Sequence, residues 1–521
     1  MSVSTRLPPG WAAIPLRDLG EWSGGGTPSK SVSSFWTAGS IPWVSPKDMK
    51  VPVISDSLDH ITDDAVRAST VKLIPAGSVL IVTRSGILAH TLPVARTAVA
   101  VTVNQDIKAL TPTPPIDPDF VAWGARALGW PILNACSKDG TTVASVDTTL
   151  LQDFRLPVAP AAEQHRIVSA IESYFTRLDD AVATLERVQR NLKRYRASVL
   201  KAAVEGRLVP TEAELARAEG RSYEPASVLL ARILAERRRR WEEAELAKMT
   251  ARGKAPKDDR WKAKYVEPVA PDTSELPELP EGWCWATADQ LAIVGTGATP
   301  KRGDARFWSG GQVPWVTSAV VNDSLVATPS EFVTHTALRE TNLTLYPPGT
   351  LLVAMYGEGK TRGRATTLGI ESATNQALAA LELRGTADYL RDWLLRFLEH
   401  NYLELRRAAS GGVQPNLNLG IVRAICVPLP PVAEQRRVSE EADRSLSIAH
   451  ATYEALTANE LKASRLRQSI LKWAFEGRLV DQDPTDEPAS VLLERIRAER
   501  ASATVTPPRR ARRTKKGTPK S

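Results

Sequence analysis

Two long stretches of the chain, 161–204 and 432–475, contain no glycine or proline and repeat apolar residues with a helical period. In the first stretch, eight steps between apolar or aromatic positions lead from Ile171 to Val199, with a mean step of about 3.5, which is the heptad spacing of a coiled coil. These positions are Ile171, Tyr174, Leu178, Val182, Leu185, Val188, Leu192, Tyr195 and Val199. We expect a helix about 65 Å long in each stretch, since a helix rises about 1.5 Å per residue.

The second stretch keeps the heptad spacing less strictly, because Ser445 and Asn459 fall on its apolar seam. That seam also contains small residues such as Ala442 and Ala449, which would let larger residues of the first helix approach closely. The pattern therefore favours two helices that pack on each other. The alternative is that each helix packs on its own globule, although a helix of this length exceeds the width of such a globule.

The segments before these stretches, about 7–157 and 279–428, are rich in Gly, Pro, Thr, Val and Trp. Within them, the apolar runs Val79–Val82 and Leu351–Ala354 follow Pro-Ala-Gly and Pro-Pro-Gly turns, which is typical of strands. Each segment also has a helical stretch, listed here by range: 117–135, where Asp117-Pro118 fits a cap and first turn, and 387–408. Both segments are predicted to be mixed α/β globules.

The chain contains one long internal repeat. An opening motif, Leu-Pro-x-Gly-Trp, occurs at 7–11 and returns at 279–283, an offset of 272. The offset falls to 271 by the Asn-Gln pairs at 104 and 375, and it stays at 271 for Glu-Gly-Arg-Leu-Val at 205 and 476. A repeat this long is a whole domain with its connector rather than a solenoid unit. We therefore expect a pseudo-two-fold molecule whose target also has two halves.

The repeat divides the chain into five predicted parts. They are a first α/β domain (1–157), a central helical spacer and connector (158–278), a second α/β domain (279–428), a distal helical spacer (429–500) and a disordered basic tail (501–521). The connector contains a predicted helix from Ala226 to about Lys248, with a charge block that starts at Arg237. Such a block is usually a solvated helix face; the alternative is a surface for docking a partner.

The net charge of +8 does not by itself indicate nucleic acid, because residues 501–521 contribute seven Lys/Arg and no acid. Each α/β segment contains 13 basic and 13 acidic side chains when 1–157 and 279–428 are counted. Any DNA-binding face must therefore be a local concentration of charge. The chain lacks an apolar run of about 18 residues, so no membrane span is expected. Three distant cysteines fit a reduced cytoplasm, and the scattered histidines show no metal-ligand spacing.

Enzyme signatures are weak in this sequence. Residues 354–361, Ala-Met-Tyr-Gly-Glu-Gly-Lys-Thr, follow a predicted strand and match a loose phosphate-loop pattern. A phosphate loop must run directly into a helix, but two glycines and two adjacent threonines follow here. The sequence also lacks the Asn-Pro-Pro-aromatic or Asp-Pro-Pro-aromatic tetrapeptide of methyltransferases and a Gly-x-Ser-x-Gly elbow. We therefore expect no catalytic residues, no metal site and no cofactor on this chain.

Basic residues gather at two places in the second α/β segment. Lys360, Arg362 and Arg364 alternate, so on a strand they would share one face, where they could meet phosphates or guanine edges. The alternative is a solvated edge strand. A second cluster follows a Gly-Ala-Thr-Pro turn, and in the first segment a single lysine corresponds to it. We take these as candidate DNA-binding residues: Lys301, Arg302, Arg306 and Lys30.

In these motifs the chain resembles a type I restriction–modification specificity subunit over about residues 7–500. The resemblance rests on the duplicated opening motifs, the Gly-x-Thr-Pro turns, and Tyr-Gly-Glu-Gly-Lys-Thr-Arg-Gly at 356–363 followed by Asn375-Gln376. It also includes the proline-rich closings at 156–160 and 427–431, each followed by Ala-Glu-Gln. Any one of these motifs is weak evidence, whereas the duplicated combination is specific.

The resemblance implies an α+β, pseudo-two-fold molecule in which two α/β target-recognition domains are joined by two long antiparallel coiled-coil helices. Each domain would recognise one half of a bipartite, asymmetric site in double-stranded DNA, with the helices as a ruler. The subunit would be non-catalytic and would recruit two modification subunits, which methylate adenine with S-adenosylmethionine. Two ATP-driven restriction subunits, with Mg²⁺, would join to cleave DNA. Partner docking is expected at the helix starts: Glu163, Gln164, Glu434 and Gln435.

Positions that are identical in both copies cannot distinguish two different half-sites. The pairs Trp36/Trp308, Trp43/Trp315 and Asn104/Asn375 are therefore expected to serve the fold or a shared partner. Positions that differ between the copies are better candidates for DNA contacts. Two other classes stay open from the residues alone: a free-standing DNA-modifying enzyme, and a tandem scaffold that binds only protein.

Overall fold

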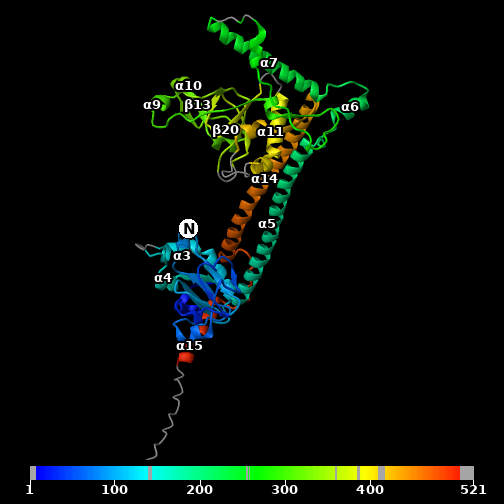
Figure 1. Ribbon diagram of the computed structural model, residues 1–521. Helices are drawn as coiled ribbons and strands as arrows, with labels where there is room; N and C mark the ends of the chain where they lie inside the picture. Colours follow the sequence, from blue (N-terminus) through cyan, green and yellow to red (C-terminus); the bar gives the residue numbers. More distant parts are fainter. Residues whose placement is uncertain are drawn as a thin grey trace, which may run out of the picture. The chain divides into compact units, whose positions relative to one another are not determined.

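The computed structural model describes residues 7–138, 143–253, 256, 258–357, 361–383, 388–408 and 417–504. The chain forms two compact units (Figure 1). Unit 1 consists of Met1–Glu186 with Thr457–Ser521, and unit 2 consists of Arg187–Leu456. Each unit therefore contains one α/β part and one half of each long helix. The five parts predicted above were delimited from the sequence repeat, whereas the two units are defined by contacts between residues. The five-part division therefore stays a prediction.

The α/β part of unit 1 contains two sheets and a strand pair. Its five-stranded sheet has the order β2 (Gly20–Gly24), β9 (Ile107–Pro112), β6 (Val79–Val82), β7 (Val94–Thr97) and β4 (Val53–Ile54). Its three-stranded sheet has the order β5 (Asp59–Ile61), β3 (Ile41–Val44) and β8 (Thr102–Val103), and β1 (Ala12–Pro15) pairs with β10 (Arg155–Val158). All four residues of β6 are buried, which places this predicted strand at the centre of the core.

Unit 2 repeats this topology, with one additional strand, β16, in its second sheet. Its five-stranded sheet has the order β12 (Ile293–Thr296), β20 (Leu378–Glu382), β17 (Leu351–Ala354), β18 (Ala365–Leu368) and β14 (Leu325–Val326). The second sheet is β15 (Glu331–Val333), β13 (Val313–Val316), β19 (Ser372–Thr374) and β16 (Leu345–Tyr346), and β11 (Cys284–Thr287) pairs with β21 (Cys426–Leu429). The sequence repeat is thus a repeat of one fold.

The predicted helical stretch in each α/β part is two helices rather than one. In unit 1 they are α2 (Pro118–Ala127) and α3 (Gly129–Cys136). The Asp117 carboxylate accepts hydrogen bonds from the backbone N–H groups of residues 119 and 120, which confirms the predicted cap. Pro131 explains the break, because a proline removes a helical hydrogen bond and clashes with the carbonyl four residues earlier. The unit 2 counterparts are α11 (Asp388–His400) and α12 (Tyr402–Ala408).

The two long helices, α5 (Ala161–Val204) and α14 (Val432–Phe475), have the predicted bounds and 44 residues each. Both end at the repeated Glu-Gly-Arg-Leu-Val motif. Gly206 and Gly477 have φ of 67° and 65°, and the following arginine N–H bonds back to a carbonyl of the last helical turn. A Cβ at Gly477 would lie 2.3 Å from Pro8, so this glycine also permits a close approach of the opening motif.

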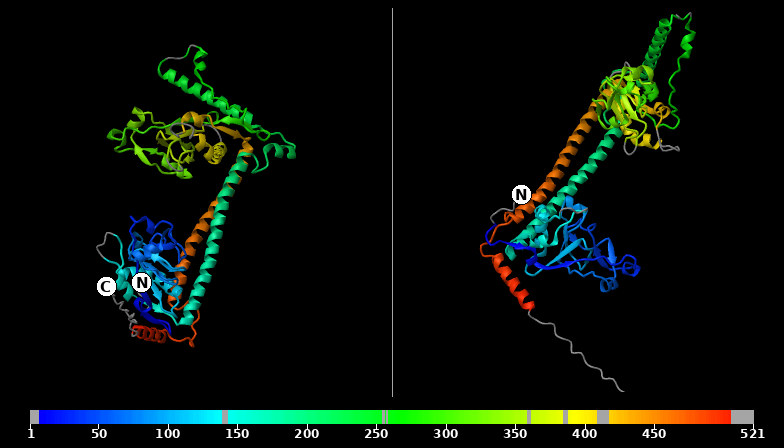
Figure 2. Two further views of the ribbon diagram at one scale, coloured as in Figure 1. Left: turned by 60° about the horizontal axis from the view of Figure 1, so that its bottom comes forward. Right: turned by 90° about the vertical axis from the view of Figure 1, so that its left-hand side faces the viewer.

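Within each unit the two helices pack against each other in antiparallel directions (Figures 1 and 2). In unit 2, Val199 packs with Ala442 and Leu446, and in unit 1 Arg467 forms an ion pair with Asp179. The predicted seam of α5 is wrong at two positions, because Tyr174 and Tyr195 are 43% and 45% exposed. In unit 1 Phe175 is half-buried beside Arg467 instead of Tyr174.

Two further helices attach to the α/β parts in the same way. The backbone N–H of Ala226, at the start of α7 (Ala226–Ala251), donates to the carbonyl of Gly282 at 2.8 Å. That of Ala489, at the start of α15 (Ala489–Thr504), donates to the carbonyl of Gly10 at 2.8 Å. The tail prediction begins four residues too early, since α15 continues to Thr504; residues 505–521 lie outside the described residues.

Shorter helices complete the units. They are α1 (Asp63–Ala68), α4 (Thr148–Asp153), α6 (Glu212–Glu219), α8 (Ala288–Leu291), α9 (Ala305–Trp308), α10 (His335–Glu340) and α13 (Leu419–Arg423), with short 3-10 turns η1 (Leu16–Asp18), η2 (Ser33–Phe35), η3 (Gly86–Ala89), η4 (Asp259–Lys264) and η5 (Ser318–Asn322). None of the helices in the described ranges has an apolar run long enough to cross a membrane.

Candidate nucleic-acid interface

A pair of perpendicular tryptophans organises the three- or four-stranded sheet of each unit. The ring centroids of Trp36 and Trp43 lie 5.2 Å apart, and those of Trp308 and Trp315 lie 5.3 Å apart. Trp43 donates to the carbonyl of Gly26 and Trp315 to the equivalent carbonyl of residue 298. These tryptophans therefore serve the shared fold, as their identity in both copies predicts.

A cation stacks on the outer tryptophan in both units. The Arg302 guanidinium lies 4.1 Å from the Trp308 ring, and the Lys30 ammonium lies 6.0 Å from the Trp36 ring. At the offset of 272, Lys30 corresponds to Arg302 within this cluster. Arg302 also binds both carboxylate oxygens of Glu331, at 2.5 and 2.8 Å.

The structure brings Lys301, Arg302 and Arg306 together around the start of α9. Lys301 is exposed, and its carbonyl accepts a hydrogen bond from Trp308. Arg306 is held by Asp304 at 2.8 Å and by Glu340 at 3.3 Å. These ion pairs are exposed and therefore weak, so a DNA phosphate could replace the carboxylates. Lys301 forms none of the ion pairs seen among the described residues, so this cation could bind a phosphate without first giving up a carboxylate.

The predicted strand with Lys360, Arg362 and Arg364 on one face is wrong. Arg362 and Gly363 form a turn, Gly363 has a φ of 82°, and strand β18 begins only at Ala365. Arg364 donates to the Asn322 side chain at 3.0 Å. Lys360 lies outside the described residues. Since a strand rather than a helix follows β17, this segment also does not form the helix start that a phosphate loop requires.

The one-residue change of repeat offset lies in this same connection. Strands β6 and β17 are related by the offset of 272, whereas β7 and β18 are related by 271. The connection between them spans 83–93 in unit 1 and 355–364 in unit 2, so it is one residue shorter in unit 2. The two scaffolds thus match on both sides of a connection that differs in length and in sequence. Recognition of two unlike half-sites requires an element that differs between the units, and this connection is such an element.

A second segment packs beside this connection in both units. In unit 1 the N–H of Val146 donates to the carbonyl of Thr83, and in unit 2 the N–H of Leu417 donates to that of Met355. At the tip of β6 stands exposed Arg84, and its unit 2 equivalent is Tyr356, 36% exposed. Sequence reasoning missed these two positions, although the change of offset pointed to their connection.

The repeated Asn-Gln pairs also hold the scaffold. The side-chain oxygens of Asn104 and Asn375 accept the backbone N–H two residues later, each at 3.1 Å. Thr27 and Thr299 donate to the side-chain oxygens of the glutamines in these pairs, Gln105 and Gln376, each at 2.6 Å. The interactions match in the two units, which supports the interpretation that positions identical in both copies serve the fold.

The helix-start residues predicted to dock a partner are buried instead. The exposed fraction is at most 1% for all four, namely Glu163, Gln164, Glu434 and Gln435. Trp11 donates to Glu163 at 3.0 Å, and Trp283 donates to Glu434 at 3.0 Å. The two glutamines donate to carbonyls at the proline-rich closings, each at 2.8 Å. Direct contact with a partner does not fit this burial; these residues join the opening motif to the long helix.

The buried Glu163 predicts a pH dependence of stability. Burial raises the pKa of Glu163 above its ordinary value of 4.5, more than the Trp11 hydrogen bond lowers it. Its stabilising contribution is therefore complete below pH 4.5 and is lost as the pH rises through the raised value. The variant Glu163→Gln keeps an oxygen for Trp11 and has no proton to lose. Denaturation of unit 1 from about pH 4 to 8 should lose this pH dependence in the variant; an unchanged slope would contradict the assignment.

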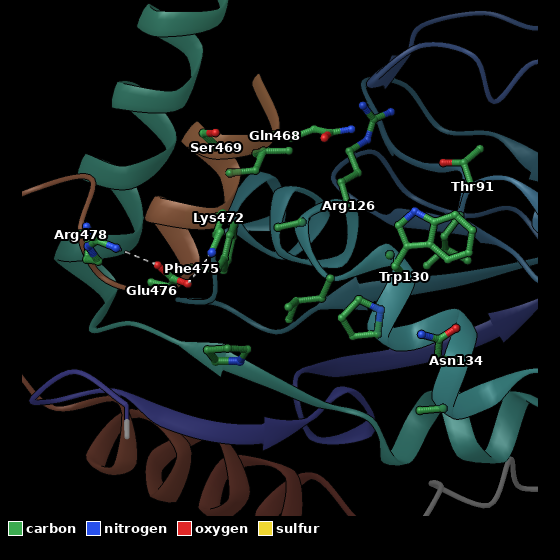
Figure 3. A pocket seen from close by; sticks show the side chains of 18 of the residues that line it. Thr91, Arg126, Trp130, Asn134, Gln468, Ser469, Lys472, Phe475, Glu476 and Arg478 are labelled. Atoms are coloured by element: carbon green, nitrogen blue, oxygen red, sulfur yellow. Dashed lines mark hydrogen bonds and ion pairs between the residues drawn. The ribbon is translucent and has the colours of Figure 1, made fainter. Parts of the chain in front are cut away.

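An open groove lies at the end of the long helix in each unit. In unit 1 it has a volume of about 1480 Å³, and Trp130, 58% exposed, faces it together with Phe475 (Figure 3). The equivalent groove of unit 2 has about 1030 Å³. Their charged residues differ in sign: unit 1 presents mainly cations and unit 2 mainly carboxylates, namely Arg126, Arg465, Lys472 and Arg478 against Glu205, Glu278 and Glu404. The two grooves share a position but offer opposite charge.

Solved structures share this fold. A chain from a structure concerned with complex assembly and conformational transition of the type I R-M system aligns with a TM-score of 0.63, covering 91% of this chain and 99% of that one. The HsdS subunit from Thermoanaerobacter tengcongensis aligns with a TM-score of 0.54 and the same coverage. The sequence identity is 18% in both alignments, so they establish similarity of fold.

Curated sequences give closer matches over parts of the chain. The EcoR124I/EcoR124II specificity subunit of Escherichia coli is 42% identical over 181 residues, which is 34% of this chain and 45% of that relative. The MjaIX specificity subunit of Methanocaldococcus jannaschii is 21% identical over 82% of this chain and 84% of its own length. Residues 8–189 and 280–443 match the profile described as type I restriction modification DNA specificity domain. Because these two segments make up more than half of the chain, the chain belongs to the family of type I restriction–modification DNA specificity proteins.

Proposed function

We propose that this chain is the subunit that recognises a bipartite, asymmetric DNA site, each α/β part binding one half. The observation that carries this proposal is the shared scaffold with one unlike connection. The five-stranded sheets, tryptophans and Asn-Gln contacts correspond in the two units, whereas 83–93 and 355–364 differ in length and charge. One scaffold with two different contact loops is suited to two different half-sites.

We further propose that the enzymatic steps belong to partner subunits. Two modification subunits would methylate adenine with S-adenosylmethionine, and two ATP-driven restriction subunits with Mg²⁺ would cleave unmodified DNA. These partners follow from the family, whose members include specificity subunits of type I restriction enzymes. A cytoplasmic location is proposed as well, supported by cysteines that are all free.

Methylome sequencing tests this proposal directly. Adenine methylation is mapped in cells with the gene, in cells without it, and in cells with the gene restored. We expect one bipartite methylation motif to disappear with the gene and to return with it. An unchanged methylome would overturn the proposal, and loss of an undivided motif would overturn the assignment of one half-site to each unit.

The contact loop of unit 2 gives a local prediction. Replacing Arg362 and Arg364 by alanine should weaken binding to the half-site of unit 2, by about tenfold for each cation that meets a base. Footprinting on a duplex that carries the motif checks this, and protection over the other half-site is the internal control. Unchanged protection at the half-site of unit 2 would exclude these arginines from the interface.

The paired helices give a prediction about spacing. Four residues inserted into both α5 and α14 add about 6 Å, and DNA rises about 3.4 Å per base pair. We therefore expect a preference for half-sites separated by one or two more base pairs, measured by selection from a duplex library with variable spacers. If the preferred spacer keeps its length, the helices do not set the separation. Equal insertions into the connection 266–282 serve as the control.

A further inference from the structure

The positive charge of this chain is concentrated outside its recognition surfaces. Residues 248–264 contain seven Lys/Arg and two acids, and residues 501–521 contain seven Lys/Arg and no acid. Together these segments contribute +12, which is four more than the net +8 of the chain, so all other residues sum to −4. Such segments can add electrostatic attraction for a polyanion to that of the local cation clusters in the recognition domains.

Both basic segments follow equivalent helices. The first residues of α7 and α15, Ala226 and Ala489, make the same 2.8 Å hydrogen bond to the glycine carbonyl of the nearest opening motif. Each α/β part therefore carries one docked helix, and each helix leads into one basic segment. The repeat has preserved this arrangement even though the segments themselves are different in sequence.

The helix α7 extends well beyond the sheets of unit 2 (Figures 1 and 2). Arg237 fixes its middle to the α/β part through an ion pair with Asp289 at 3.4 Å. Beyond that point, Trp241 stacks on Trp261 with centroids 6.0 Å apart and contacts Tyr265 at 5.3 Å. The returning segment is thus packed on the helix, so its cations are held in place rather than carried on a loose chain.

The charges along α7 differ between its middle and its far end. In the middle, Arg239 pairs with Glu236 and Glu243, and Arg238 pairs with Glu242, so this block is neutralised internally. The far end has an excess of cations, which we call the arm tip: Lys248, Arg252, Arg260, Lys262 and Lys264. Three of these cations form ion pairs: Lys248 with Glu245, Arg260 with Asp258, and Lys262 with Glu242 and Asp259. Their side chains are 65%, 91% and 35% exposed, and ion pairs at exposed positions are weak enough to be exchanged for a phosphate.

We propose that the arm tip binds the phosphate backbone of duplex DNA outside the half-site of unit 2. The 26 residues of α7 span about 39 Å, or about 11 base pairs, so the tip can reach flanking DNA. This inference rests on the proposed function, because it takes DNA to be bound at the recognition domains. Duplex DNA is favoured over an acidic protein because it is the polyanion that those domains hold.

The test compares two fluorescent duplexes in titrations of the full chain with its modification partner. Both carry the methylation motif; one ends at its borders and the other has flanks of about 20 base pairs on each side, longer than the reach of α7. One variant neutralises the arm tip: Lys248→Gln, Arg252→Gln, Arg260→Gln, Lys262→Gln and Lys264→Gln. A matched control exchanges Lys and Arg at the same five positions and so keeps the charge.

We expect the neutral variant to bind the long duplex about tenfold more weakly. The slope of log affinity against log salt should fall by about 4.5 if all five cations contact phosphates, since each lost contact reduces it by about 0.9. Binding to the short duplex should stay within about twofold, and the control should match the wild type. Equal losses on both duplexes, or no loss on the long one, would overturn the inference. Reduced capture of the partner with unchanged DNA binding would identify the arm as a protein-docking surface instead. Failure of the proposed function would give a different result, because no methylation motif would then depend on this chain.

Discussion

Replacing Trp283 by alanine is expected to lower the free energy of unfolding of unit 2 by about 3–5 kcal/mol, the range for a buried tryptophan. The Trp283 ring is buried against Trp393, with centroids 5.4 Å apart, and its indole N–H is bonded to the buried Glu434. The variant therefore leaves both a cavity and a buried carboxylate with one donor fewer. Calorimetry should show one of two transitions shifted downwards by about 6–20 °C, because the chain has two compact units.

The chain provides a matched control two residues away. Trp285 is only half-buried, and its N–H donates to a linker carbonyl at residue 277. Its replacement by alanine should lower the free energy of unfolding by about 1 kcal/mol. A second comparison is Trp11→Ala, which should shift the other transition through Glu163. If Trp283→Ala and Trp285→Ala have equal effects, the contact between the opening motif and the long helix is not what stabilises the unit.

Replacing residues 279–428 by residues 7–157 is expected to change the recognised sequence entirely. The methylation motif should then contain two copies of the unit 1 half-site, in opposite orientations because the helices run antiparallel within each unit. The exchange is feasible because both long helices have 44 residues and begin after equivalent closings. Discrimination between the old and new motifs should reach about 10³-fold or more, since each mismatched base pair reduces affinity by about 1–3 kcal/mol.

Two outcomes of the exchange would be informative in opposite ways. Two half-sites in the same orientation would show that the halves are not related by a two-fold axis. A motif that keeps the original second half would show that recognition does not lie in 279–428. The reverse exchange, with the second domain in both places, is the control, and it should give two copies of the other half-site.

The long-range organisation was predictable because the repeat and the helix period are strong signals. The bounds of α5 and α14 agree with the predicted ranges, since proline and the Glu-Gly-Arg motif delimit stretches free of helix breakers. The strands β6 and β17 were predicted because a short apolar run after a glycine turn has few alternatives. Gly77, in the turn before β6, has the positive φ that such a turn needs.

The candidate site was less predictable, because contacts between distant residues decide it. The alternation of Arg362 and Arg364 suggested a strand, but Gly363 between them adopts a turn and aligns strand β18 only afterwards. Polarity suggested that Glu163 faces a partner, but the indole of Trp11, 152 positions earlier, binds it inside the fold. On a helix, the positions three and four residues after a seam residue can both face the partner helix. After Ile171 these are Tyr174 and Phe175, and Phe175 rather than Tyr174 is the half-buried one.

The docking of α15 on unit 1 determines the order in which the chain can fold as it is synthesised. The core of unit 1 includes Phe475, Leu492 and Ile496 from the end of the chain. Unit 2, by contrast, is one continuous segment, Arg187–Leu456. At about 5–20 residues per second, roughly 15 to 60 s pass between translation of unit 1's first segment and of its last helix. The first domain to leave the ribosome is therefore the last to be completed. Its apolar core stays incomplete until the C-terminal helix is made, unless chaperones bind it.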